Sequence, residues 1–197
     1  MCGIVGYIGN RQARPILIEG LKRLEYRGYD SAGLAVLHDG QITIRKAVGR
    51  IHALEAVLDE QGSHATLGIA HTRWATHGAP NEKNAHPHVS QSGRIALAHN
   101  GIIENYRTLR TFLEQKGITC RSDTDSEVLV QLIGHFYDGN IEQAVRDGLH
   151  EVQGTYGIVV VNADEPDRII AARKGSPLII GVGDGEYIVA SDAAAII

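Results

Sequence analysis

The second residue of this chain combines two groups that could attack an amide or an ester. Removal of Met1 would leave Cys2 with a thiol and a free α-amine on the same residue. Near neutral pH part of that amine is unprotonated, because its reference pKa is about 7.7–8.0, against about 8.5 for the thiol. The amine can take the thiol proton directly or through one water, without a histidine base. The alternative for Cys2 is a small buried residue at the start of a strand.

The polar stretch at 73–93 is long and nearly patternless, and loops of about twenty residues in a compact domain are usually functional. It opens with Arg73 at the end of a predicted strand, followed by backbone that includes Gly78. An arginine in this position suits bidentate capture of a carboxylate. Trp74, the chain's one tryptophan, is either a mobile aromatic lid or a core anchor.

The dipeptide Asn100-Gly101 follows the next predicted strand. The asparagine amide and the glycine N–H offer two donors that could converge on one oxyanion, and removing one such donor typically costs about 10²–10³ in kcat. The alternative is an ordinary turn, because Asn-Gly is a common turn dipeptide.

The segment Ser-Asp-Thr-Asp-Ser-Glu at 122–127 precedes a predicted helix. Such residues commonly cap a helix N-terminus, where their oxygens accept backbone N–H groups. The functional alternative places one carboxylate, which we take to be that of Asp125, against a substrate ammonium. One residue can do both only if its two oxygens divide the work.

Neither a metal nor a cofactor is predicted. Histidines 71, 77, 86, 88 and 99 fall within one third of the chain, but no cysteine pair and no His-Glu-x-x-His sequence accompanies them. The glycine-rich stretch at 181–186 has Glu186 where a nucleotide-binding fingerprint needs glycine or alanine, and no predicted helix follows. A hairpin turn is the better interpretation.

Periodic apolar residues and turn signals predict the elements that must position these side chains. Helices are expected at 13–24, 51–59, 104–116, 125–137 and 141–149. Strands are expected at 2–8, 32–37, 41–48, 66–72, 94–99, 155–162, 168–172, 178–182 and 187–190. Asp39-Gly40 is a strong hairpin signal, so the sheets should be mostly antiparallel, with helices inserted between groups of strands. The expected class is α+β.

Length and composition fit one globular domain and exclude several functions. The 197 residues carry a net charge of −4, so no cationic field exists to hold nucleic acid. Two cysteines cannot form a disulfide framework, and no apolar run reaches the roughly 18 residues that a membrane span needs. We therefore expect a cytoplasmic protein. The apolar residues at 193–197 suggest, as a hypothesis, the front piece of a longer protein.

A series of motifs in order resembles the class II glutamine amidotransferases. They lie at 1–6, 25–33, 72–78, 84–88, 99–105 and 123–127, and they begin with Met-Cys-Gly-Ile-Val-Gly. Within the family, Tyr-Asp-Ser at 29–31 and Trp-Ala-Thr-His at 74–77 resemble the branch that makes amino sugars. The amidophosphoribosyltransferase branch would instead have Gln-His-Arg-Gly-Gln and Arg-Tyr-Ser-Thr at the corresponding places.

The resemblance implies a fold and a set of roles. The fold is that of the N-terminal-nucleophile hydrolases, a four-layer α/β/β/α arrangement with two stacked antiparallel sheets. Cys2 would attack the side-chain amide of L-glutamine and form a γ-glutamyl thioester, with its α-amine as base. Asn100 and the Gly101 N–H would stabilise the oxyanion, Arg73 would bind the substrate α-carboxylate and Asp125 its α-ammonium.

The resemblance also implies supporting roles. Thr76 and His77 would line a closing loop, Trp74 would gate the release of ammonia, and Arg27 would help to position the nucleophile. No cofactor is implied, and the products are glutamate and ammonia.

The expected partners are C-terminal sugar-isomerase domains in a homo-oligomeric parent, which would transfer the ammonia to fructose 6-phosphate. The fragment alone should hydrolyse glutamine without making an amino sugar. The rival interpretations are another class II amidotransferase, a non-catalytic domain that binds glutamine for regulation, and a histidine-rich metal-binding module.

Overall fold

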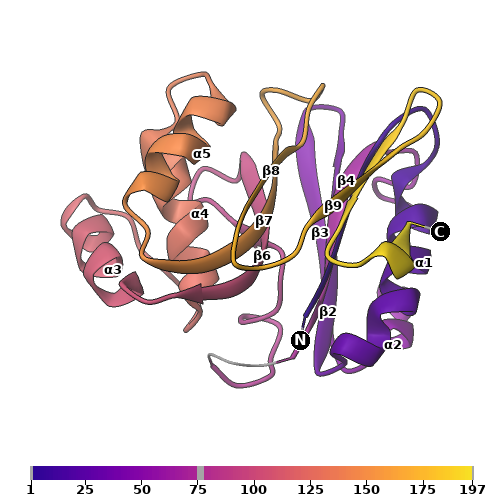
Figure 1. Cartoon of the computed structure of the whole chain (residues 1–197), viewed down its shortest axis with the longest axis horizontal. Helices are drawn as coiled ribbons and strands as arrows, with labels where there is room; N and C mark the ends of the chain where they lie inside the picture. The colour runs from indigo at the N-terminus through magenta and orange to yellow at the C-terminus, as the bar shows by residue number, and fades with distance from the viewer. Residues whose placement is uncertain (1, 75–77, 197) are drawn as a thin grey trace.

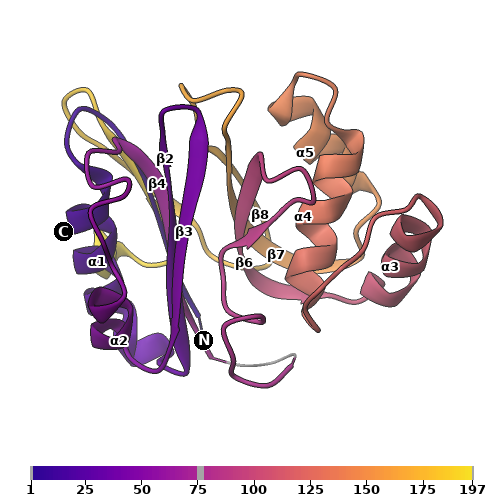
Figure 2. The same cartoon turned by 180° about the vertical axis from the view of Figure 1, so that it is seen from behind.

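The protein has four layers in this computed structural model, which describes residues 2–74 and 78–196 (Figure 1). A six-stranded and a four-stranded sheet lie face to face in the middle, and helices cover both outer faces. The view from behind shows the same order of layers (Figure 2). The predicted α/β/β/α architecture is therefore confirmed.

The larger sheet is antiparallel throughout and has the strand order β3-β2-β4-β1-β10-β9. Its strands are β1 (Gly3–Ile8), β2 (Ser31–His38), β3 (Gln41–Val48), β4 (Leu67–Arg73), β9 (Ile179–Val182) and β10 (Tyr187–Ala190). Helices α1 (Ala13–Leu24) and α2 (Ile51–Ala56) pack on its outer face. The first strand of the chain thus lies in the interior of the sheet, between β4 and β10.

The smaller sheet is also antiparallel and has the order β5-β6-β7-β8. Its strands are β5 (His88–Val89), β6 (Ile95–Ile103), β7 (Gly154–Asn162) and β8 (Ile170–Lys174). Helices α4 (Asp125–Phe136) and α5 (Ile141–His150) cover it, and α3 (Tyr106–Gln115) packs beside α4.

The hairpin between β2 and β3 forms where the sequence predicts it. His38 pairs with Gln41, so the loop consists of Asp39 and Gly40, whose φ angles are 49° and 70°. A two-residue loop with positive φ at both positions matches the right-handed twist of the flanking strands. Glycine at the second position removes the steric cost of that conformation.

Helix α1 fixes the strand that follows Cys2. Its buried face includes Leu17, Leu21 and Leu24, spaced three and four residues apart. Gly20 lies on the same side, and a Cβ there would come within 3.0 Å of the Val5 side chain on β1. The absence of a side chain at this position allows the helix to pack closely on β1 and so to hold the start of that strand in place.

The space between the two sheets is filled by apolar side chains from both. Ile4 and Ile69 from the larger sheet meet Ala98 and Val159 from the smaller one, and all four are fully buried. This packing fixes β6 against β1 and β4. Residues on these three strands can therefore form a site with a defined geometry.

The structure corrects the prediction that Asn100-Gly101 ends a strand or forms a turn. Strand β6 continues to Ile103, and Asn100 and Gly101 pair with Gly157 and Tyr156 of β7. The turn propensity of the dipeptide is overridden because the pairing with β7 runs without a break from Ile95 to Ile103.

The helix predicted at 51–59 ends at Ala56. Beyond it, the Asp59 carboxylate bonds to the Arg45 guanidinium at 2.5 Å, which holds this segment against β3. Within the described ranges, no helix has the length and apolar character that a membrane crossing requires.

Candidate active site

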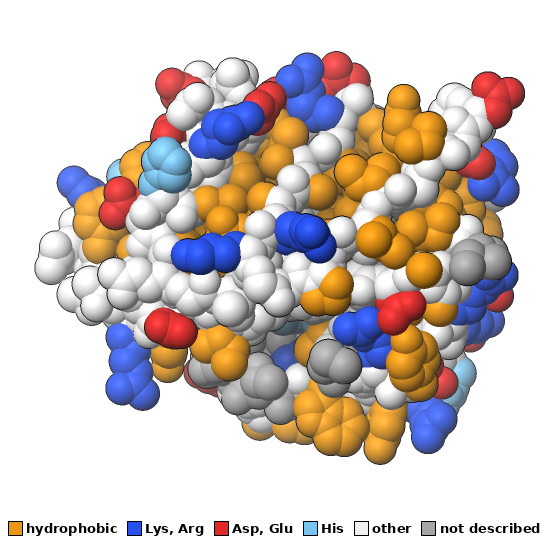
Figure 3. Space-filling view, viewed as in Figure 1, with side chains coloured by type: hydrophobic (Ala, Val, Ile, Leu, Met, Phe, Trp, Pro, Cys, Tyr) orange, Lys and Arg blue, Asp and Glu red, His pale blue; other side chains and the backbone are white. Residues whose placement is uncertain are grey.

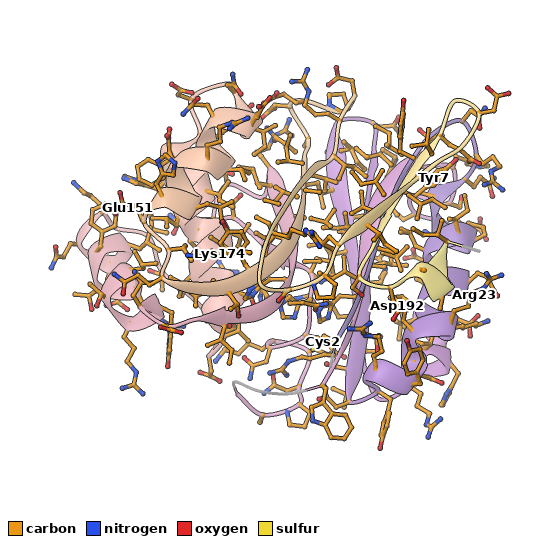
Figure 4. The ribbon with its side chains drawn as sticks, viewed as in Figure 1. Cys2, Tyr7, Arg23, Glu151, Lys174 and Asp192 are labelled. Carbon is orange, nitrogen blue, oxygen red and sulfur yellow. The ribbon has the colours of Figure 1, made fainter. Side chains whose placement is uncertain are left out.

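A cavity of about 340 Å³ collects most of the polar residues that the sequence singles out. Its lining includes Cys2, Arg73, Asn100, Gly101 and Asp125. Trp74 and Arg27 also line it. Cys2 lies at the end of the larger sheet (Figure 4), and the same view of the surface shows a hollow beside this point (Figure 3). The elements that meet here are β1, β4, β6 and the start of α4.

Cys2 immediately precedes β1, and its thiol lies against the backbone that leaves β4. The Trp74 N–H donates to Cys2 Sγ at 3.2 Å, and the carbonyl oxygen of Trp74 lies 3.5 Å from the same sulfur. Burial raises the pKa of the Cys2 thiol, and the bond from the Trp74 N–H opposes this rise more weakly. The thiol is therefore protonated at neutral pH and needs a base before it can attack.

Asn100 joins the two sheets at the site. Its Nδ2 donates to the Cys2 carbonyl oxygen at 3.1 Å, and its Oδ1 lies 2.9 Å from His71 Nε2. Gly101 follows in an unusual conformation, with a φ of 136°, and a Cβ there would lie 2.1 Å from the Thr155 carbonyl oxygen. Among the genetically encoded residues, glycine alone fits this position without displacing β7.

Asp125 is the first residue of α4, but Thr124 is its N-cap. Thr124 Oγ1 accepts the Glu127 N–H at 3.2 Å, whereas Asp125 Oδ2 accepts the Ile103 N–H at 2.8 Å and Oδ1 accepts from Ser126 Oγ at 3.3 Å. The carboxylate is thus held by the end of β6 and is not consumed by capping. It is 4% exposed and lines the cavity, where it supplies negative charge.

Arg73 ends β4 and supplies the opposite charge. Its guanidinium donates to the carbonyl oxygens of Gly78 at 3.2 Å and Ala79 at 3.4 Å, and the side chain is buried. A buried cation and a buried carboxylate, that of Asp125, therefore line one cavity. Such a pair suits a small zwitterion.

Trp74 is not a core anchor. It is 50% exposed, and its ring makes an edge contact with Tyr29 at a centroid distance of 5.5 Å. The predicted loop residues Thr76 and His77 lie outside the described residues.

Arg27 lies in a 3₁₀ turn (Glu25–Arg27) and is hydrogen-bonded to the segment after β10. Its guanidinium donates to Asp192 Oδ2 at 2.8 Å and to the Ser191 carbonyl oxygen at 3.5 Å. Ser191 in turn exchanges hydrogen bonds with the backbone of Ile4 on β1. Arg27 thus supports the strand that follows Cys2.

Histidines form a buried group beside the cavity, and one of them, His86, also lines it. His71 and His86 stack at a centroid distance of 4.1 Å, and His88 meets His86 edge-on at 4.7 Å. Burial lowers the pKa of His71 to about 3 and the pKa values of His86 and His88 well below the usual range. No group of three or more histidine, cysteine or acidic residues in the described part of the chain could hold a metal ion.

The sequence does not reveal the residues that hold the site together. His71 stands out there only as one of several histidines, and Thr124 and Ser126 only as helix-capping candidates. In the structure, His71 contacts Asn100, and Ser126 Oγ lies 2.7 Å from His99 Nδ1. These contacts join β4, β6 and α4, which are far apart in sequence.

Comparison with known families decides what kind of domain has this geometry. Residues 71–197 match the family described as a glutamine amidotransferase domain. The chain belongs to this family. Two sequence relatives, from Caldanaerobacter subterraneus subsp. tengcongensis and Chlorobaculum tepidum, are 54% and 57% identical over the whole chain, and both are named glutamine–fructose-6-phosphate aminotransferase (isomerizing). The predicted resemblance to this branch of the family is confirmed by the name that both relatives carry.

This chain spans about a third of the length of those relatives, 32% and 33%. The solved glutamine phosphoribosylpyrophosphate amidotransferase from B. subtilis is 29% identical, with a TM-score of 0.85 over 99% of this chain and 43% of that one. A class-II glutamine aminotransferase domain protein from Silicibacter pomeroyi shares the fold, with a TM-score of 0.59 at 18% identity over 96% of this chain and 88% of that one. The predicted N-terminal-nucleophile hydrolase fold is confirmed.

Proposed function

We propose that this domain hydrolyses L-glutamine to glutamate and ammonia through a thioester on Cys2. The observation that carries the proposal is the cavity itself. It places a thiol, an amide donor, a buried arginine and a buried carboxylate around a space of about 340 Å³. A free amino acid with a side-chain amide matches these groups in size and in charge.

The chemical steps use groups that the chain supplies once Met1 is removed. The α-amine of Cys2 takes the thiol proton, and Sγ attacks the amide carbon of glutamine. The oxyanion that forms is stabilised by Asn100 Nδ2 and the Gly101 N–H. Collapse of this tetrahedral intermediate breaks the C–N bond, while the α-ammonium of Cys2 gives its proton to the amide nitrogen, which leaves as ammonia. Water, deprotonated by the same amine, then attacks the thioester, and glutamate leaves as the thiol is restored.

The substrate is oriented by its two α-carbon charges. Arg73 binds the α-carboxylate and Asp125 the α-ammonium, which leaves the side-chain amide to reach Cys2. Thr76 and His77 line a loop that closes over the bound substrate, and Trp74 gates the release of ammonia. Arg27 keeps β1, and with it the nucleophile, in position through its bonds to Asp192 and Ser191.

In the parent protein, the ammonia passes to other domains. The relatives' name and the fraction of their length that this chain covers support C-terminal sugar-isomerase domains that convert fructose 6-phosphate to glucosamine 6-phosphate. The parent is a homo-oligomer, acts in the cytoplasm, and needs no metal, cofactor, nucleic acid or membrane for the glutaminase step. The domain alone releases ammonia and makes no amino sugar.

The decisive experiment combines N-terminal mass analysis with a glutamine-analogue electrophile, 6-diazo-5-oxonorleucine. Protein without Met1 is expected to hydrolyse glutamine and to take up one label at Cys2. Cys2→Ala should lose both properties. Cys120→Ala is the matched control, because Cys120 is the chain's other cysteine and does not line the cavity. Glutamine binding without hydrolysis by the processed protein would instead favour a regulatory domain and overturn the proposal.

A further inference from the structure

The hydrogen bonds of His71 determine which end of the Asn100 amide faces it. His71 Nε2 lies 3.2 Å from the backbone oxygen of His99 and 2.9 Å from Asn100 Oδ1. A backbone carbonyl can only accept, so Nε2 must carry the proton. The asparagine atom that meets the same N–H must then be the oxygen. The His71 tautomer and the orientation of the Asn100 amide therefore both follow from the His99 carbonyl group, which can only accept a hydrogen bond.

The other end of the amide leads to the same assignment. Cys2 presents its carbonyl oxygen 3.1 Å from Asn100 Nδ2, and this oxygen also can only accept. An NH₂ group has two hydrogens, and the bond to Cys2 uses one of them. The second remains for an oxyanion in the cavity. A flipped amide would place its oxygen beside the nucleophile, where it would repel the developing negative charge.

We propose that His71 is a positioning residue that holds the Asn100 amide with its donor end toward the reacting carbonyl. The inference rests on the proposed function, because it assigns a role within the same reaction. His71 does not touch the substrate. It acts by restricting rotation of the Asn100 side chain, so that the donor is in place before the oxyanion forms.

The surroundings of His71 keep it in the required state. The ring is fully buried, stacked on His86, and its pKa is lowered to about 3 by burial, with His99 and Arg73 adding smaller effects in the same direction. It is therefore neutral throughout the range in which an enzyme works. Its Nδ1 has no hydrogen-bond partner in residues 2–74 and 78–196, as suits the unprotonated nitrogen of this tautomer.

The strand pattern explains how a histidine comes to lie there. On β4, Leu67 and Ile69 face the smaller sheet and pack between the sheets. His71 is the next residue in this alternation, so it meets β6 at the point where the apolar layer ends and the cavity begins. Its neighbour on β2 is Gly33, where a Cβ would lie 2.2 Å from the His86 carbonyl oxygen. Because Gly33 has no side chain, the backbone of His86 can lie close to β2, where the His86 ring supports that of His71.

The test compares His71→Leu with His71→Gln in the processed protein. Leucine fills similar space without a donor, whereas the glutamine NH₂ can reach the place of Nε2. We expect His71→Leu to lower kcat for glutamine hydrolysis at least about tenfold. This loss should be smaller than the loss of about 10²–10³ that removal of an oxyanion donor itself causes. KM should stay unchanged, because the ground-state substrate is bound by Arg73 and Asp125. His71→Gln should recover much of kcat.

A double-mutant cycle separates positioning from general damage. In an Asn100→Ala background, His71→Leu should have no further effect on kcat, because the group through which His71 acts is already gone. Ile69→Val, on the same face of β4, controls for lost stability and should leave kcat intact. An equal loss in both backgrounds, or a kcat unaffected by His71→Leu, would overturn the inference. Failure of the unmodified protein to hydrolyse glutamine would instead refute the proposed function.

Discussion

Two hollows on this molecule differ in what lines them. The larger, about 690 Å³, lies between α5 and strands β8, β9 and β10, and its walls include Ile170, Ile180 and Val189. Apolar side chains gather on this face around several basic ones (Figure 3). The smaller, about 340 Å³, has a thiol, a guanidinium, an amide and a carboxylate in its lining. Volume alone would therefore not select the hollow that holds the proposed nucleophile.

The charged groups of the two hollows are also held differently. In the larger one, Arg146 pairs with Glu142 one helical turn away on α5, and both side chains are more than half exposed. Exposed pairs of this kind contribute only about 0–1 kcal/mol to stability. In the smaller one, Asp125 accepts a backbone N–H from β6 and is almost fully buried. Partners from other elements, rather than local ion pairs, therefore hold the Asp125 carboxylate of the proposed site.

The largest expected effect comes from a methyl group at Gly101. A Cβ there meets the Thr155 carbonyl oxygen at 2.1 Å at a positive φ. Gly101→Ala should therefore destabilise the protein by about 2–5 kcal/mol, from backbone strain of about 1–2 and overpacking of about 1–3. The variant should also lose glutamine hydrolysis, because the added methyl group would force β6, which carries Asn100, to move. Gly93→Ala, at positive φ in open space, should cost about 1 kcal/mol and leave activity intact. Urea unfolding and a glutaminase assay measure both variants.

Charge removal inside the smaller hollow should weaken substrate binding. Arg73→Gln and Asp125→Asn each remove a charged hydrogen-bonding group, worth about 1.5–3 kcal/mol, so KM for glutamine should rise about 10- to 100-fold. Steady-state kinetics should show a smaller change in kcat. Arg146→Gln in the larger hollow is the matched control. A fall in kcat at constant KM would mean that these residues do not bind the α-carbon charges.

The buried histidines should make the fold sensitive to acid. In the unfolded chain a histidine takes up a proton near pH 6.5, but folded His71, His86 and His88 resist it because burial lowers their pKa values. Below pH 6.5 the unfolded state therefore binds more protons than the folded state does. The free energy of unfolding has its full value above that pH and should fall as the pH decreases toward about 3. Thermal melts from pH 7.5 to 4.5 test this. His86→Phe should reduce the slope, and His52→Asn, at an exposed site, should not.

Local pattern predicts much of this fold. The apolar spacing of 13–24 gives α1 with its observed ends, and Asp39-Gly40 gives the β2–β3 hairpin, because neighbouring residues decide both. The end of β6 could not be predicted in this way. The turn tendency of Asn100-Gly101 loses to pairing with β7, which lies more than fifty residues away. The sequence predicts that strand but does not reveal that it pairs with β6.

The candidate site shows the same difference between what local sequence predicts and what contacts between distant elements decide. The residue types of Cys2, Arg73, Asn100 and Asp125 were sufficient to nominate them, and the structure brings all four to one cavity. Their supports were not predictable. The contact of His71 with Asn100 depends on the stacking of two sheets, and the bond from Ile103 to Asp125 depends on how far β6 extends. A sequence lists reactive groups but does not show which distant backbone orients them.

The smallest effects should come from the larger hollow and the strand at its edge. Val182 and Ile180 on β9 are 75% and 63% exposed, so Val182→Ser and Ile180→Ser should change stability by no more than about 0.5 kcal/mol. Neither side chain lines the thiol cavity, so kcat and KM for glutamine should match those of the unmodified domain. Differential scanning calorimetry with the glutaminase assay checks both. A marked loss of activity in either variant would show that the two hollows are coupled, because no charged group is removed and no core contact is lost.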